Sequence, residues 1–192
     1  MQTKINVQLT GIAPIMFDRY TGKKESSAED KVYLSGKDII IPAINIMSFL
    51  CAKNTNSAAK RFNDIRTYSR ICDDILSFVT VEPADIPVLR NGKTIQFSGF
   101  ENDEDKKAKM RLHRAVARLP KGIPNEKCRP LLDLPWAVAF SIIIYPNEFD
   151  ITPQVLKRLF DLGGTAIGLG TFRGIFGKFV VDKWIIEKKG AK

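Results

Sequence analysis

A glycine-rich stretch near the carboxyl end constrains the fold of this chain more than any other feature. Six of the eighteen residues from Leu162 to Phe179 are glycine. Glycine costs backbone entropy unless its position needs a positive φ or a close approach between two backbones. The stretch follows an amphipathic segment and precedes the last apolar run, so we expect either a tight packing corner or a loop shaped to receive a ligand.

The familiar glycine motifs do not fit this stretch. Phosphate-binding glycine loops follow a strand and open a helix, whose N-terminus then meets the phosphate. Here the predicted order is helix, loop and strand, and neither Gly-Lys-Ser nor Gly-Lys-Thr occurs in the stretch. The segment from Arg173 to Val181 contains elements of the RNA-recognition submotif, but Ile175 and Lys178 displace its aromatic residues. We therefore expect no cofactor and treat the submotif as an accidental match.

Periodicity and turn signals predict the elements of the amino-terminal half. Residues 4–10 alternate between polar and apolar side chains, which indicates a half-buried strand. Ser35-Gly36 marks a tight hairpin, and Pro42 is typical of the first turn of a helix. Ser57 suits the N-cap of a second helix, and Asn91-Gly92 predicts a type I′ hairpin.

The carboxyl-terminal half contains two further strands around a helix. The run from Trp136 to Tyr145 is apolar on both faces, as expected of a central strand. Thr152 and Pro153 form an N-cap and first-turn pair that starts a helix, and we expect this helix to stop at Gly163-Gly164. Residues 178–187 predict the last strand.

Together these elements predict an α+β fold of the ferredoxin-like (RRM-like) class. Without its excursions the order is β-α-β-β-α-β, in which an antiparallel sheet carries its helices on one face. We expect residues 1–192 to form one domain, with residues 101–130 as a charged insertion that includes a basic hairpin.

The net charge of +9 is concentrated in that insertion. Residues 106–129 hold nine Lys and Arg against one acid, after four acids between Glu101 and Asp105. A basic surface of this kind favours a polyanionic partner such as nucleic acid. From this order of charges we hypothesise that the acid run shields the basic run until nucleic acid displaces it.

Cysteine usage and hydropathy exclude other classes. Cys51, Cys72 and Cys128 form no CxxC pair, and a single histidine accompanies them, so we expect no metal site and reduced, mostly buried thiols. The longest apolar run is about half the length needed to cross a bilayer. These features predict a cytoplasmic protein without a membrane partner.

The glycine stretch, together with what precedes it, resembles the RAMP superfamily of CRISPR-associated proteins. The resemblance rests on the segments LTGIAPIMF and YLSGKDIIIPAINIMSFL and on a glycine loop that follows the second helix. Its residues are Gly163, Gly164, Gly168, Gly170, Arg173, Gly174 and Gly177. Small phage-borne and prokaryotic proteins have this general form.

The resemblance implies a protein that binds RNA or single-stranded DNA without catalysis. In the family the glycine loop lies against the phosphate backbone and an inserted basic hairpin grips the strand. Copies bound along one strand would lie side by side, so we expect self-association or other subunits of a complex as partners. The predicted nucleic-acid-binding residues are Lys109, Arg111, Arg114, Arg118, Lys121, Gly168, Gly170, Phe172, Arg173, Gly174 and Lys178.

Two alternatives remain open from the sequence. His113 is the only histidine, and the same resemblance includes endoribonucleases that use a histidine to cleave RNA through its own 2′-hydroxyl. The chain is also consistent with a protein-assembly or phage structural module in which the glycine loop packs against a neighbour. A further set of cations, Lys60, Arg61, Arg66 and Arg70, is expected to be a solvated helical face rather than a binding face.

Overall fold

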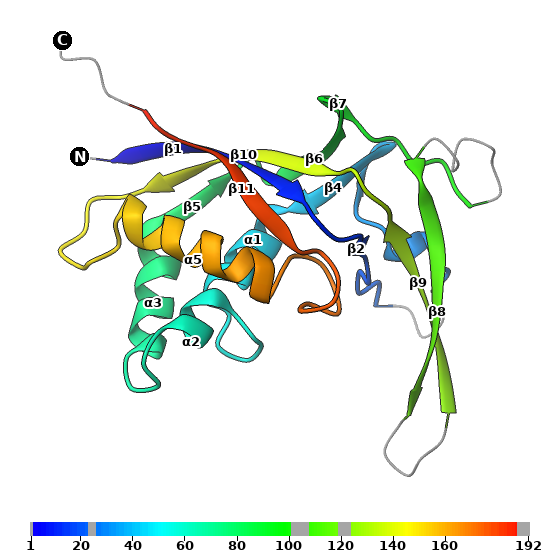
Figure 1. The fold of residues 1–192 in the computed structure, drawn as a ribbon, viewed down its shortest axis with the longest axis horizontal. Helices are drawn as coiled ribbons and strands as arrows, with labels where there is room; N and C mark the ends of the chain where they lie inside the picture. Colours follow the sequence, from blue (N-terminus) through cyan, green and yellow to red (C-terminus); the bar gives the residue numbers. More distant parts are fainter. Residues whose placement is uncertain (1, 23–25, 101–107, 119–123, 188–192) are drawn as a thin grey trace.

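The strands and helices follow the predicted order, and the helices gather on one side of a large sheet (Figure 1). The computed structural model describes residues 2–22, 26–100, 108–118 and 124–187. In this part of the chain the main sheet contains eight strands. They are β1 (Thr3–Gly11), β3 (Leu34–Ser35), β4 (Asp38–Pro42), β5 (Val79–Glu82), β6 (Asp85–Arg90), β7 (Lys93–Thr94), β10 (Ala137–Ile144) and β11 (Phe179–Ile186).

Four neighbouring strands have the order and directions of a ferredoxin-like fold. β1 lies between β11 and β10, β5 pairs with the other edge of β10, and all these pairs are antiparallel. The register sets Val7 of β1 opposite Phe140 of β10 and Trp184 of β11. β6 pairs with β10 beside β5, and β4 and β3 extend the sheet beyond β6. The predicted fold class is confirmed.

The helices are short, and two of them begin at the predicted caps Ser57 and Thr152. They are α1 (Ala43–Cys51), α2 (Ala58–Phe62), α3 (Tyr68–Phe78) and α5 (Pro153–Ala166), with a 3₁₀ turn η1 at Glu29–Lys31. The Ser57 hydroxyl accepts the Lys60 N–H at 3.4 Å, and the Thr152 hydroxyl accepts the Val155 N–H at 3.3 Å. Pro42 is the N-cap of α1 rather than its first helical residue. Among the described residues, no helix is long and apolar enough to cross a membrane.

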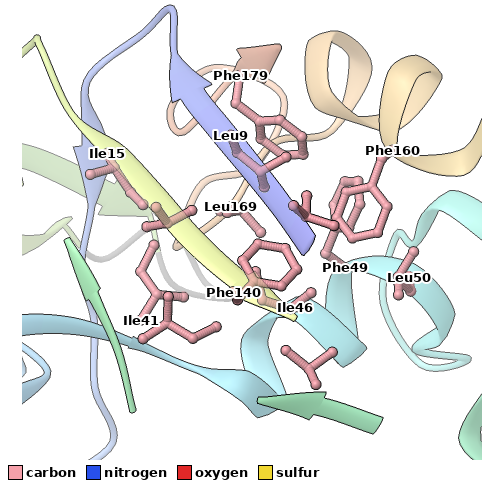
Figure 2. Packing of buried hydrophobic residues seen from close by; sticks show 14 of the residues in the cluster. Leu9, Ile15, Ile41, Ile46, Phe49, Leu50, Phe140, Phe160, Leu169 and Phe179 are labelled. Atoms are coloured by element: carbon pink, nitrogen blue, oxygen red, sulfur yellow. The ribbon is translucent and has the colours of Figure 1, made fainter. Parts of the chain in front are cut away.

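Aromatic rings fill the space between the helices and the sheet (Figure 2). The centroid of the Phe49 ring on α1 lies 5.4 Å from that of Phe160 on α5 and 5.3 Å from that of Phe179 on β11. The expectation that α5 stops at Gly163-Gly164 is wrong, because the helix continues through both to Ala166. A Cβ on Gly163 would lie 2.6 Å from the Phe49 ring, and one on Gly164 would lie 2.5 Å from the Phe179 carbonyl oxygen. These glycines let α5 approach α1 and β11.

The basic segment forms a regular hairpin in a second sheet. Its strands are β8 (Met110–Arg118) and β9 (Pro124–Leu132), and β9 also pairs with β2 (Ile15–Met16). The chain enters this second sheet directly after β1. At this point Gly11 leaves room for the buried indole of Trp136. The indole N–H of Trp136 donates to the Ala13 carbonyl at 2.8 Å. The hairpin extends away from the helices in Figure 1. We call β8 and β9 the basic hairpin below.

Candidate nucleic-acid interface

The connection between α5 and β11, residues 167–178, is a closed loop that we call the glycine loop. α5 ends where the N–H groups of Ile167 and Gly168 both donate to the Gly163 carbonyl, at 2.8 and 3.1 Å. The Leu169 N–H then donates to the Gly177 carbonyl at 2.9 Å, which joins the two ends of the loop. The buried Leu169 side chain points into the core and anchors the loop there (Figure 2).

The glycine loop is also tied to the segment that leads from β1 to β2. The Thr171 N–H donates to the Met16 carbonyl at 2.9 Å, and the Gly177 N–H donates to the Pro14 carbonyl at 2.7 Å. The Lys178 carbonyl accepts the N–H groups of Ile12 and Ala13, at 2.8 and 3.3 Å. The Lys178 backbone therefore fixes the base of the loop, and the same hydrogen bonds fix the position from which its half-buried side chain extends.

Backbone packing explains most of the glycines in this loop. Gly168, Gly170, Gly174 and Gly177 all have left-handed backbones, with φ between +70° and +98°. A Cβ on Gly170 would lie 2.5 Å from the Met16 carbonyl oxygen, and one on Gly168 would lie 2.7 Å from the Gly177 carbonyl. Gly174 is different, because its nearest neighbour would be 3.9 Å from a Cβ. Contact between these glycines and a phosphate backbone remains a prediction.

Phe172 is the unusual residue of the glycine loop. Its φ of +54° is a left-handed conformation that a bulky side chain adopts at an energetic cost. Half of its side chain, 50%, is exposed to solvent. A glycine would adopt this backbone conformation at lower cost.

The basic hairpin and the glycine loop meet at two aromatic contacts. The Arg129 guanidinium lies 4.9 Å from the centroid of the Phe172 ring, and the His113 ring lies edge-on to Phe176 with 5.4 Å between centroids. His113 and Arg129 are directly opposite each other on β8 and β9, so they share one face of the hairpin. Two segments that the sequence predicts as one binding surface are therefore adjacent.

Each arginine of the basic hairpin whose side chain is described lies within ion-pair distance of a carboxylate. Arg111 pairs with Asp133 at 2.9 Å, and Arg114 pairs with Glu126 at 3.3 Å. Arg129 pairs with Asp18 at 2.7 Å, and both side chains are largely buried. The sequence predicts that Arg111 and Arg114 bind nucleic acid, and these ion pairs reduce the attraction for phosphate that each can supply.

Arg90 fixes the base of the basic hairpin to the main sheet. Its guanidinium donates to the carbonyls of Ala108, Asp133 and Pro135 at 2.6, 2.9 and 2.9 Å. These carbonyls belong to the segments that enter β8 and leave β9. Burial lowers the pKa of Arg90, although arginine keeps its proton at neutral pH. The hairpin is thus held at a set position beside the glycine loop.

Arg173 connects the glycine loop to the helical side of the molecule. Its guanidinium donates to the Thr55 hydroxyl at 2.8 Å, in the connection between α1 and α2. Burial lowers the pKa of Arg173 from its usual value, because the charged guanidinium loses part of its hydration. The predicted phosphate contact at Arg173 is therefore positioned by a hydroxyl from a different segment.

The remaining predicted residues occupy different places. Lys109 is exposed at the start of β8 with a left-handed φ of +51°. Arg114 lies opposite Cys128, on the face of the hairpin that His113 and Arg129 do not share. For Arg118 only the backbone within β8 is described, and Lys121 lies outside the described residues, as does the acid run from residue 101 to 105.

The sequence interpretation missed residues of this interface. Arg129 is part of the basic run, but nothing in the sequence sets it apart from the other cations or pairs it with Asp18. Thr55 lies 118 residues from Arg173, and no local pattern joins them. Only the tertiary fold brings these side chains together.

Comparison with known proteins gives one informative result. No family model and no curated protein matches the chain. Among solved structures, the chain is similar to a chain of a type III-B Cmr-β complex bound to cognate target RNA, with a TM-score of 0.57 at 10% identity. The alignment covers 97% of this chain and 61% of that chain, so this protein spans about three fifths of the length of its structural neighbour. The likeness establishes that this chain shares its ferredoxin-like fold with a chain of that RNA-bound complex.

Proposed function

We propose that this protein binds single-stranded RNA at the junction of the glycine loop and the basic hairpin, as one subunit of a ribonucleoprotein complex. The RNA-bound complex that contains its structural neighbour supports RNA as the ligand. A partner subunit or a further copy of this chain would occupy the same RNA strand. Binding, rather than cleavage, is the proposed activity.

The observation that carries this proposal is the arrangement of Phe172 and Arg129. A half-exposed ring on a left-handed backbone of the glycine loop has a guanidinium of the basic hairpin 4.9 Å from its centroid, and this ring is the proposed platform for a base. Bases of single strands stack on such rings without sequence preference. Duplex bases are already stacked on each other, so the platform favours single strands.

Four cations of the glycine loop, the basic hairpin and the residue before β8 are available for phosphates. Within the described part of the chain, Lys109, Lys127, Arg173 and Lys178 have no carboxylate within ion-pair distance. Lys127 lies opposite Ala115, on the hairpin face that His113 and Arg129 share. With four such cations, the electrostatic part of the affinity comes from a few phosphate contacts.

We expect the affinity for a short oligonucleotide of about six nucleotides to fall with salt at a log–log slope of about −3. Each neutralised phosphate on a single strand contributes about −0.7, and four contacts are available. Fluorescence anisotropy with labelled single-stranded RNA, single-stranded DNA of the same sequence and duplex RNA measures this slope. Single-stranded RNA should bind more tightly than duplex RNA at every salt concentration.

The same titrations separate the alternatives. Equal affinity for duplex and single strand would contradict a stacking platform, and the absence of binding at low salt would rule out the proposal. Tighter binding of the DNA strand would change the ligand but not the site. Shortened RNA on a denaturing gel in the presence of EDTA, abolished by His113→Ala, would instead establish an endoribonuclease.

A further inference from the structure

A second group of cations lies on the helical side of the molecule. Lys60 and Arg61 belong to α2, Arg66 to the turn before α3, and Arg158 to α5. We call these four residues the helical cation surface. All four side chains are exposed, and within the described residues none has a carboxylate at ion-pair distance. They contrast with the described arginines of the basic hairpin, which are paired.

Aromatic rings are interleaved with these cations. The Lys60 ammonium lies 5.8 Å from the centroid of the Tyr68 ring, and the Arg61 guanidinium lies 6.0 Å from that of Phe62. The Arg158 guanidinium donates to the Phe62 carbonyl at 3.2 Å, which joins α5 to the end of α2. Cations beside half-buried rings are typical of grooves that bind single-stranded nucleic acid.

The helical cation surface is continuous with the glycine loop. Arg173 of the loop donates to Thr55, and the Lys60 ammonium donates to the Lys53 carbonyl at 3.0 Å, in the same connection between α1 and α2. Figure 1 shows this connection between the glycine loop and α2. The order in space is therefore basic hairpin, glycine loop, Thr55 and then the helical cation surface.

We propose that a single strand leaving the glycine loop passes over Thr55 and that its phosphates contact Lys60, Arg61, Arg66 and Arg158. This inference rests on the proposed function and extends its site. It also reverses the expectation from the sequence that these helices present only a solvated face. The link from the glycine loop through the α1–α2 connection to Lys60, and the rings beside Lys60 and Arg61, favour nucleic acid over an acidic protein as the ligand.

The test is the dependence of the salt slope on oligonucleotide length. For the unaltered protein, an RNA of about fifteen nucleotides should give a slope steeper than the six-nucleotide RNA by up to about 3, from four additional contacts of about 0.7 each. In the Arg61→Gln/Arg66→Gln variant, the slope for the long RNA should decrease in magnitude by about 1.4, and the slope for the short RNA should not change. Neither side chain is buried, so the variant retains the fold, which its melting curve checks.

A matched control separates a local contact from net charge. The Lys93→Gln/Lys183→Gln variant removes the same two charges from exposed positions on β7 and β11 of the main sheet. Its slope for the long RNA should equal that of the unaltered protein. An equal decrease in both variants would overturn the inference, because net charge would then explain the effect.

The outcomes distinguish this inference from the proposed function. One outcome is that the short RNA binds but the long RNA gives the same salt slope as the short RNA. Another is that the Arg61→Gln/Arg66→Gln variant gives the same slope for the long RNA as the unaltered protein. In either case the inference fails and the proposed function stands. These cations would then serve another ligand, such as an acidic protein. If neither RNA binds, both are overturned.

Discussion

Replacement of Phe172 by glycine should weaken the binding of single-stranded RNA by about 5- to 150-fold without loss of stability. Stacking of one base on an aromatic ring contributes about 1–3 kcal/mol, and the glycine removes the ring entirely. The folded protein loses the contact with Arg129, about 0.5–1 kcal/mol, but it no longer holds a bulky residue at a φ of +54°. Relief of that conformation offsets the loss. Anisotropy titrations and thermal melting measure the two effects independently.

Two control variants make this result specific to the ring. Phe172→Trp keeps an aromatic face and should retain most of the affinity. Ile175→Ala removes another exposed apolar side chain of the glycine loop, 68% of it accessible, and should change the affinity by no more than about 2-fold. Wild-type affinity in Phe172→Gly would show that the platform does not contact a base.

Gly170→Ala should lower the free energy of unfolding by about 2–5 kcal/mol, although it adds a single methyl group. About 1–2 kcal/mol comes from an L side chain at the left-handed φ of +77°. A further amount of about 1–3 kcal/mol comes from overpacking, because the new Cβ would lie 2.5 Å from the Met16 carbonyl oxygen. Urea denaturation followed by circular dichroism measures the change.

The control for this prediction is Gly36→Ala. Gly36 also has a left-handed φ, +63°, but a Cβ there would have nothing within 4 Å. This variant should therefore show only the conformational part, about 1–2 kcal/mol. Equal losses at both positions would mean that the glycine loop and β2 do not pack as closely as the structure indicates.

Local patterns were sufficient for most elements of the fold. The alternation in residues 4–10, the apolar run of β10 and the caps at Ser57 and Thr152 each depend on neighbouring residues, so the sequence alone predicts them. The prediction that α5 ends at Gly163-Gly164 was wrong because a glycine can occur near the end of a helix for two physical reasons. A C-cap needs a left-handed backbone, whereas close packing needs only the absence of a Cβ, and the sequence does not distinguish them.

For the basic segment, local patterns were not sufficient. Its cations are visible in the sequence, but whether each is free depends on a carboxylate brought close by folding. Asp18 reaches Arg129 from 111 residues away, and Asp133 reaches Arg111 across the end of the hairpin. Charge counting therefore does not show that Arg111, Arg114 and Arg129 are paired with carboxylates while Lys60 and Arg61 of α2 are not.

By itself, the sequence determined the order of strands and helices, the ferredoxin-like class and the position of the glycine loop, because periodicity and capping act over a few residues. Only the tertiary structure decided which glycines close the loop, which arginines are neutralised and that Phe172 lies against Arg129. Those properties depend on distances between segments that are remote in the chain. The glycine loop was predicted as a candidate binding element, and its neighbours, the hairpin on one side and Thr55 on the other, define the surface that our proposals test.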